Sequence, residues 1–155
     1  MLIRHATIED LHAVAAMCAQ FHAASPHAAI TGPASGHAIL TAVRALILKA
    51  PDEATVLVAQ RADGTFAGFL LGAFATLWWD TSQRLAQELA WWIEPSAKGG
   101  RTGMALLWRW LQEAREAGCE FAGMSTLCPK DVPGIPAREG FQPCETGWLI
   151  RLAED

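Results

Sequence analysis

The sequence predicts an α/β fold of the α+β kind, in which helices cover a mixed β-sheet. Short β-branched runs alternate with longer segments whose apolar residues recur at helical spacing. Turn and capping residues stand between these segments. The 155 residues show no composition break or internal repeat, and 52% of them are apolar. We therefore expect one domain, residues 1–155, with a sizeable core.

The N-terminal segment predicts a strand followed by two helices. Residues 2–6 form the strand, and Thr7 with Asp10 has the pattern of an acidic capping box that opens the first helix. This helix is expected to end at Phe21 or His22. The stretch 22–36 is rich in Ala, Ser, Pro and Gly, and it predicts a loop before the second helix.

Further along, residues with special backbone preferences separate the elements. Ser35 is a candidate N-cap, Asp63-Gly64 tolerates the positive φ of tight hairpins, and Gly118 suits a helix C-terminus. In order, we expect a helix ending at Pro51, strands 55–60 and 66–75 joined by a turn at 61–64, a loop at 77–82, a strand at 84–93, a helix at 102–117, a strand at 120–127, a proline-broken helix at 128–139 and a strand at 145–152.

Charge and hydropathy exclude several classes of function. The net charge of −4 argues against broad electrostatic attraction to nucleic acid or to an anionic membrane surface. The apolar runs are too short to span a bilayer, and the N-terminus lacks the hydrophobic region of a signal peptide. These features predict a cytoplasmic protein without a nucleic-acid or membrane partner.

Cysteine and histidine spacing predicts neither a disulfide framework nor a metal site. No two of Cys18, Cys119, Cys128 and Cys144 form a C-x-x-C pair, so we expect reduced thiols. The five histidines contain no i, i+4 pair with a nearby carboxylate of the H-E-x-x-H kind. We expect them to be surface or hydrogen-bonded side chains.

The stretch from Glu88 to Leu107 has the pattern of a phosphate-binding device. An apolar strand, Leu89 to Ile93, runs into Glu94-Pro95, then a small basic loop, then a helix that opens near Gly103. The exposed N–H groups and positive dipole end of a helix N-terminus attract anions, and Lys and Arg add charge. The alternative is an ordinary strand-to-helix loop with solvated basic residues.

This loop and the order of elements resemble the GNAT superfamily of acyl-CoA-dependent N-acetyltransferases over nearly the whole chain. The family signature Q/R-x-x-G-x-G/A corresponds here to residues 98–103, Lys-Gly-Gly-Arg-Thr-Gly. Lys98 stands where Gln or Arg is usual, Arg101 replaces the first glycine, and Gly103 matches the second. Arg-Glu-Gly-Phe at 138–141 is similar to the family's closing "GF" turn.

The resemblance implies a mostly antiparallel sheet of about six to seven strands with about four helices, splayed between the fourth and fifth strands. It also implies acetyl transfer from acetyl-CoA to a primary amine of a small molecule or peptide. The pantetheine arm would pair with the end of the fourth strand, and the pyrophosphate would lie at the helix N-terminus. The cofactor-binding residues expected on this basis are Trp92, Ile93, Glu94, Lys98, Gly99, Gly100, Arg101, Thr102, Gly103 and Met104.

The chemistry needs a base, an oxyanion donor and a proton for the thiolate. The family implies Glu88 as general base, and strand alternation puts it on one face with Ala90, Trp92 and Glu94; the alternative is a solvated strand-start residue. A backbone N–H near Ile93 would be the oxyanion donor. The chain has no tyrosine, the usual acid of the family, so Cys128, Ser125, Thr126 or water would protonate the thiolate.

The acceptor side is predicted from aromatic residues and from position. Trp78, Trp79 and Asp80 could form the wall of an amine pocket, and the family resemblance places the segment around His22 beside the acceptor. Plain packing or a homodimer contact is the alternative for these residues. An alternative function for the whole chain is a GNAT-like module that binds acyl-CoA as a sensor or structural subunit and catalyses little.

Overall fold

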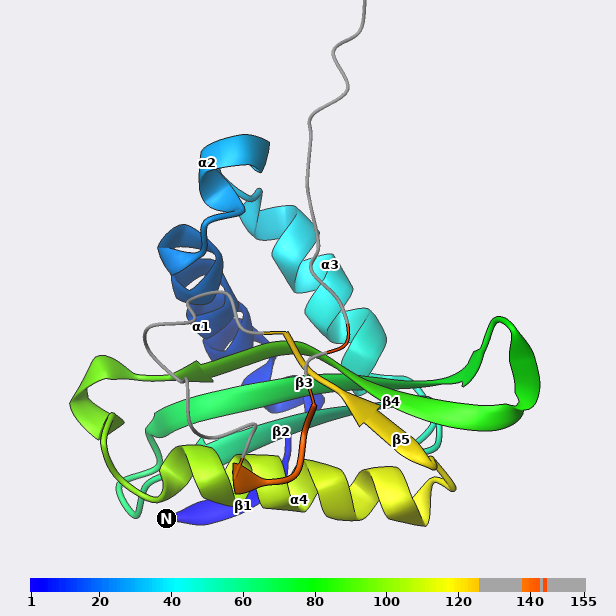
Figure 1. Cartoon of the computed structure of the whole chain (residues 1–155). Helices are drawn as coiled ribbons and strands as arrows, with labels where there is room; N and C mark the ends of the chain where they lie inside the picture. The colour runs from blue at the N-terminus through cyan, green and yellow to red at the C-terminus, as the bar shows by residue number, and fades with distance from the viewer. Residues whose placement is uncertain (126–137, 143, 145–155) are drawn as a thin grey trace, which may run out of the picture.

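The chain forms a five-stranded sheet with helices on both faces (Figure 1). The structure is a computed structural model, and it describes residues 1–125, 138–142 and 144. Helices α1, α2 and α3 lie above the sheet in Figure 1, and α4 runs along the opposite face. The sheet therefore has two covered faces, as the sequence predicted.

Strands lie in the order β1-β2-β3-β4-β5, and every neighbouring pair is antiparallel except β4 with β5, which is parallel. A parallel pair needs a crossover connection, and α4 supplies it. The elements are β1 (Leu2–His5), η1 (Ile8–Asp10), α1 (Leu11–Ala24), α2 (Ala28–Thr31), α3 (Gly36–Ile47), β2 (Ala54–Gln60), β3 (Phe66–Leu77), β4 (Asp80–Ile93), η2 (Pro95–Ala97), α4 (Thr102–Glu116) and β5 (Phe121–Gly123).

Two apolar clusters hold the layers together. The first joins α1 and α3 to one face of the sheet, and Val14, Val58 and Phe69 are buried in it. The second joins α4 to the other face through side chains that include Leu106 and Trp110. Alternate residues of β2 and β3 enter opposite clusters, as the period of two in an extended strand requires.

The structure confirms most of the predicted turn and helix-capping residues. Gly64 has φ +87° in the β2–β3 turn, and Gly118 has φ +75° just after α4. Asp10 accepts a hydrogen bond from the Thr7 backbone N–H at 2.8 Å, which opens η1 and then α1. The hydroxyl of Ser35 accepts one from the Ala38 N–H at the start of α3.

The loop predicted at 22–36 is partly wrong. Helix α1 continues to Ala24, and a short helix α2 follows it at Ala28–Thr31. Alanine is the best helix former, so an alanine-rich stretch propagates a helix despite its loop-like composition. The Ser25 hydroxyl accepts a hydrogen bond from the His27 N–H at 3.0 Å, in the turn that precedes α2.

The loop predicted at 77–82 is also wrong, because β3 and β4 form a tight hairpin there. Leu77 pairs with Asp80, so only Trp78 and Trp79 make the turn. Asp80 accepts hydrogen bonds from the backbone N–H and hydroxyl of Ser82, at 3.1 and 2.6 Å. Aspartate bonded in this way fixes a turn without the Gly or Asn that marks most hairpins.

Strict alternation along β4 fails at Glu88. Ala90 and Trp92 pack on the α1 side as expected, but Glu88 pairs with Gly72, a position that faces Trp110 of α4. The register shifts between Leu71 and Gly72, so one residue of β4 is extra. This β-bulge moves Glu88 to the other face from Ala90 and Trp92.

Three predicted elements extend beyond the described residues. The helix at 128–139 and the strand at 145–152 fall almost wholly outside them, as does the end of the strand at 120–127. Within the described part of the chain, the sheet has five of the expected six to seven strands. No helix among these residues is long and apolar enough to cross a bilayer.

We predict that Gly72→Ala destabilises the fold by about 1–3 kcal/mol, because the new methyl group would clash with Trp110 Nε1 and lie 2.9 Å from its Cδ1. Gly36→Ala, at an open helix position, is the matched control and should leave stability nearly unchanged or slightly higher. Urea unfolding followed by tryptophan fluorescence measures both. Equal free energies of unfolding for Gly72→Ala and the wild type would contradict this packing.

Candidate functional site

The parallel pairing of β4 with β5 is short, and the edge of β4 opens beyond it. Leu85 to Gln87 pair with Phe121 to Gly123. Within the described residues, β4 has no strand partner on that side from Glu88 to Ile93. The two strands therefore separate at this point, in agreement with the splay expected between the fourth and fifth strands.

Only some backbone groups of β4 face this open edge. The Glu94 N–H donates to the Ala67 carbonyl at 2.9 Å, and the Trp92 carbonyl lies against Gly68 of β3. Because hydrogen-bonding direction alternates along a strand, the N–H and C=O of Ile93 point away from β3. Of the three strand-end residues predicted to pair with pantetheine, Ile93 presents its backbone groups to the opening.

The N-terminus of α4 stands just beyond the end of β4. Gly99 has φ +79°, which lets the chain turn sharply between η2 and the helix. A Cβ at Gly103 would lie 3.1 Å from Trp91, so glycine lets the helix start close to the strand. The first helical hydrogen bond runs from the Ala105 N–H to the Arg101 carbonyl at 2.9 Å.

The N–H groups of residues 102–104 precede that bond and have no acceptor among the described residues. They lie at the positive end of the helix dipole, which favours an anion. Arg61, in the turn between β2 and β3, holds the segment before them, because its side chain donates a hydrogen bond to the Ser96 hydroxyl of η2 at 3.1 Å. The result is a preformed row of donors next to an open strand edge.

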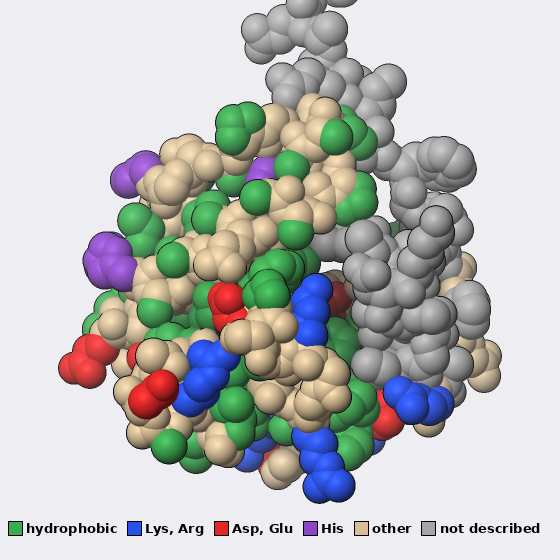
Figure 2. All heavy atoms as spheres, turned by 90° about the vertical axis from the view of Figure 1, so that its left-hand side faces the viewer, with side chains coloured by type: hydrophobic (Ala, Val, Ile, Leu, Met, Phe, Trp, Pro, Cys, Tyr) green, Lys and Arg blue, Asp and Glu red, His purple; other side chains and the backbone are tan. Residues whose placement is uncertain are grey.

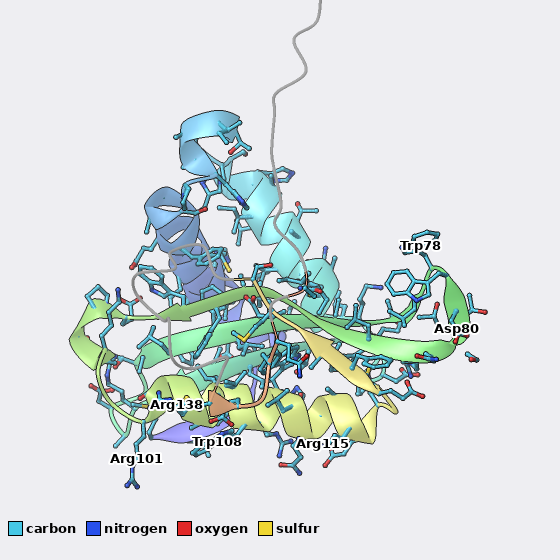
Figure 3. The ribbon with its side chains drawn as sticks, in the orientation of Figure 1. Trp78, Asp80, Arg101, Trp108, Arg115 and Arg138 are labelled. Carbon is cyan, nitrogen blue, oxygen red and sulfur yellow. The ribbon has the colours of Figure 1, made fainter. Side chains whose placement is uncertain are left out.

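The two basic residues of the loop point in different directions. Lys98 lies over the Trp92 ring with its Nζ 5.6 Å from the ring centroid, and Trp92 Nε1 donates to Glu94 at 3.3 Å. The Arg101 side chain is exposed and projects away from the sheet and α4 (Figure 3). Lys98 is therefore held beside the loop, whereas Arg101 must turn inward to reach an anion there.

Charge is not concentrated on this end of the molecule. Figure 2 looks onto the side of the structure from which η2 and the start of α4 project, and its Lys and Arg side chains are dispersed among carboxylates. Any anion binding here must depend on local donors rather than on a broad basic field. This agrees with the net charge of −4.

Glu88 is a buried carboxyl at the point where the strands separate. Only 7% of the residue is exposed, and burial raises its pKa to about 7. The Ser125 backbone N–H donates to Oε2 at 3.2 Å, which opposes part of that rise. A carboxyl with this pKa is half ionised near neutral pH and can exchange a proton there.

A second buried carboxyl, which the sequence did not point to, lies on α4. Glu113 Oε2 accepts from the Thr55 hydroxyl at 2.6 Å, and Oε1 lies 2.7 Å from Arg109 Nε and 2.9 Å from His5 Nε2. These contacts tie α4 to β1 and β2. The i, i+4 spacing of Arg109 and Glu113 was the only sequence signal, and it usually marks a solvated helix face.

The predicted acceptor residues lie apart from one another. Trp78 and Trp79 are 85% and 65% exposed, and their rings stack edge to face at the hairpin tip. Figure 3 shows Trp78 and Asp80 at the opposite end of the sheet from Arg101. His22 lies on α1, where its Nε2 is 3.3 Å from the Thr31 hydroxyl. The structure does not bring these residues together.

The remaining candidates concern thiols and metals. Cys128, a predicted catalytic residue, lies outside the described residues. Burial raises the pKa of Cys18 to about 12, which makes that thiol unreactive. Among the residues that the structure describes, no three His, Cys, Asp or Glu side chains gather as metal ligands.

Comparison with solved structures shows which fold this is. A ribosomal-protein-alanine N-acetyltransferase from Brucella melitensis biovar Abortus 2308 is 18% identical, with a TM-score of 0.70 over 98% of this chain and 100% of that one. The aminoglycoside N-acetyltransferase AAC(6')-Iy in complex with CoA is 17% identical, with a TM-score of 0.74 over 97% and 93%. Glucosamine-6-phosphate N-acetyltransferase from Arabidopsis thaliana is 11% identical, with a TM-score of 0.75 over 98% of both chains.

These likenesses extend over nearly the whole chain, and the chain has the fold of the GNAT acetyltransferases. The predicted resemblance is confirmed at the level of the fold. No protein-family model and no curated protein matches the sequence. The similarity is therefore one of structure, at identities below 20%.

We predict that Glu88→Gln stabilises the protein by about 2–3 kcal/mol at pH 8 and leaves its stability unchanged at pH 4. The folded-state pKa of about 7 exceeds the ordinary 4.5, so native stability is full below pH 4.5 and falls as pH rises to 7. Glutamine carries no such charge. Denaturant unfolding at the two pH values measures the difference, and a pH-independent effect would contradict the burial of an ionising group.

Proposed function

We propose that the chain is an N-acetyltransferase that moves an acetyl group from acetyl-CoA to a primary amine by direct attack. One observation carries the proposal: a helix N-terminus with open N–H groups stands at the end of a strand whose edge is also open. A long ligand with a phosphate portion and an amide-containing arm would be held by both features. CoA has this chemical form.

The residues present fit such a ligand. Residues 102–104 offer backbone donors to the pyrophosphate, and the positive φ of Gly99 turns the loop around it. Lys98 adds positive charge beside the loop, and Arg101 reaches the phosphate by a change of rotamer. Ile93 offers its C=O to an amide N–H of the arm, which leaves the Ile93 N–H for the thioester carbonyl.

The solved structures support the same assignment by their chemistry. The solved structures that this chain resembles include three N-acetyltransferases, one of them in complex with CoA. Their acceptors differ: a ribosomal protein, an aminoglycoside and glucosamine 6-phosphate. The shared feature is acetyl transfer to nitrogen, so the proposal commits to that reaction and to an acceptor with a primary amine.

Acetyl-CoA supplies the acetyl group as a thioester, and the chain's own residues do the rest. Glu88 removes a proton from the acceptor ammonium, directly or through water, which frees the nitrogen lone pair for attack. The Ile93 N–H donates to the carbonyl oxygen as it gains negative charge. Water, Ser125 or Cys128 returns a proton to the departing thiolate, since the chain has no tyrosine.

We propose that the acceptor amine lies on the open side of β4 and that more distant parts of the acceptor contact His22 or the hairpin tip, which are separate places on the surface. Trp78 and Trp79 offer exposed aromatic faces to a cation, and Asp80 offers a carboxylate. Because they lie at the far end of the hairpin, they suit an extended acceptor such as a peptide. A homodimer contact is the competing use of the same exposed rings.

The absence of tyrosine favours one alternative, an acyl-CoA sensor that uses the same site without turnover. Both functions predict binding of the CoA ester, and only the enzyme predicts release of free thiol with an amine. Two experiments separate them.

We predict that acetyl-CoA raises the melting temperature of the wild type and that a Lys98→Ala/Arg101→Ala variant loses most of this rise. The two side chains carry the positive charge of the loop at residues 98–103, which leads into the predicted pyrophosphate site. Lys49→Ala/Arg115→Ala removes the same charges elsewhere, with Arg115 at the other end of α4, and should respond like the wild type. Absence of any shift with acetyl-CoA or other CoA esters would overturn both the enzyme and the sensor.

We predict thiol release with at least one member of an amine panel, and a loss of about 10²–10⁴-fold in kcat for Glu88→Gln. The panel contains peptides with free N-termini, lysine, polyamines, amino sugars and aminoglycosides. The wild-type rate should fall below pH 7 as Glu88 is protonated, because its folded pKa is about 7. Binding without thiol release for every amine would favour the sensor, and full activity of Glu88→Gln would exclude Glu88 as the base.

A further inference from the structure

Three cross-strand neighbours form a row on the α4 face of the sheet. Thr55 of β2 pairs with Gly72 of β3, and Gly72 pairs with Glu88 of β4. Directly opposed residues of antiparallel strands point to the same face. A Cβ at Gly72 would meet both Trp110 of α4 and Thr55, so the indole edge of Trp110 occupies the middle of this row.

The indole N–H of Trp110 has no hydrogen-bond acceptor among the described residues, although the residue is fully buried. It is the Nε1 atom that lies nearest to the position of a Gly72 Cβ. A buried donor without an acceptor is rare in a folded protein, and it calls for a specific explanation. Two buried carboxyls, Glu113 and Glu88, flank the row.

Glu113 already has a hydrogen-bond donor at each of its two oxygens. Its Oε2 accepts from Thr55, and its Oε1 faces both Arg109 and His5. Glu88 has one donor, the Ser125 N–H to Oε2, and no described residue donates to Oε1. The Trp110 indole N–H, which lacks an acceptor, and Glu88 Oε1, which lacks a donor among the described residues, therefore lie at neighbouring positions of this row.

No direct hydrogen bond joins the two groups in the structure, so a contact between them needs one bridging water molecule or a turn of the Glu88 side chain. The Cβ atoms of opposed residues lie about 4.5–5.5 Å apart, and the Trp110 edge stands at the Cβ position of Gly72. The Glu88 carboxyl can turn about its own side-chain bonds within that distance. Water between two buried polar groups is a common element of protein interiors.

We propose that Trp110 is a positioning residue for Glu88, whose Oε1 accepts a hydrogen bond from the indole N–H, directly or through one water molecule. The contact orients the carboxyl on the rigid surface of α4 and stabilises its ionised form. Its effect on catalysis rests on the proposed function, in which Glu88 is the base. The contact itself does not depend on that function.

The charged and titratable groups near this row are few. Glu88 comes from β4, Glu113 and Arg109 from α4, and His5 from β1. Among the described residues, the other buried indole N–H without an acceptor belongs to Trp91, whose ring lies against Gly103 at the start of α4. Only Trp110 should follow the ionisation of Glu88.

Nuclear magnetic resonance tests the contact without any activity measurement. In ¹H–¹⁵N spectra between pH 4.5 and 8.5, the indole signal of Trp110 should shift as Glu88 titrates, with a midpoint no higher than about 7, because the indole contact opposes the rise in pKa that burial causes. The shift should vanish in Glu88→Gln and persist in Glu113→Gln. The proposal would be overturned if the Trp110 indole signal still titrated in Glu88→Gln, or if no indole signal of the wild type depended on Glu88. Neither measurement requires a Trp110 variant to fold.

Kinetics tests the positioning role. Trp110→Phe keeps a ring in the core but removes the donor, so the acid limb of the pH–rate profile should move up by about one pH unit. The rate should then fall about tenfold at pH 6 and little at pH 9. Trp108→Phe is the matched control, because its indole on the same helix donates to Glu139 instead. A loss of rate in Trp110→Phe that is equal at every pH would overturn the positioning role.

The two proposals fail in different ways. If Glu88→Gln keeps full activity while the Trp110 signal still follows Glu88, the base assignment is wrong and the contact stands. If Glu88→Gln is inactive but no indole signal follows Glu88, the contact is wrong and the base assignment stands.

Discussion

Backbone hydrogen bonding determines the place at which we propose that this molecule binds its ligand. Because α4 is the crossover between β4 and β5, the chain leaves β4 at Ile93 and returns at Phe121 to pair with only three residues. From Glu88 onward, β4 lacks a strand partner on that side among the described residues. The same connection places the open N–H groups of α4 beside the unpaired edge. Backbone groups without partners on a rigid scaffold are available to hydrogen-bond a ligand.

The β-bulge in β4 determines the environment of the Glu88 carboxyl. Without the bulge, Glu88 would share a face with Ala90 and Trp92, on the side of α1 and α3. The register shift instead pairs it with Gly72 under α4, where burial raises its pKa to about 7. A carboxyl on a solvated strand edge would have an ordinary pKa and would be a weak base.

The sequence predicts the features that depend on local chemistry and misses those that depend on distant residues. The turn at Gly64, the cap at Ser35 and the end of α4 at Gly118 were all readable, because glycine and serine favour those conformations on their own. The tight turn at Trp78 was not, since Asp80 and the register of two long strands make it. Helix α2 was missed because Pro and Ser also mark loops.

In the candidate site, too, the sequence predicts the residues that are close together in the chain and misses those that only the fold brings together. Residues 98–103 and Glu88 stand out in the sequence because a strand, a loop and a helix are contiguous there. Gly72 and Trp110 are 38 positions apart and carry no motif; only the packing of α4 on β3 brings them together. Position 72 must lack a side chain for the indole to approach, and the indole must approach for its N–H to be near Glu88. A glycine inside a strand normally weakens it, and here it lets the Trp110 indole pack against β3, which a larger residue at position 72 would prevent.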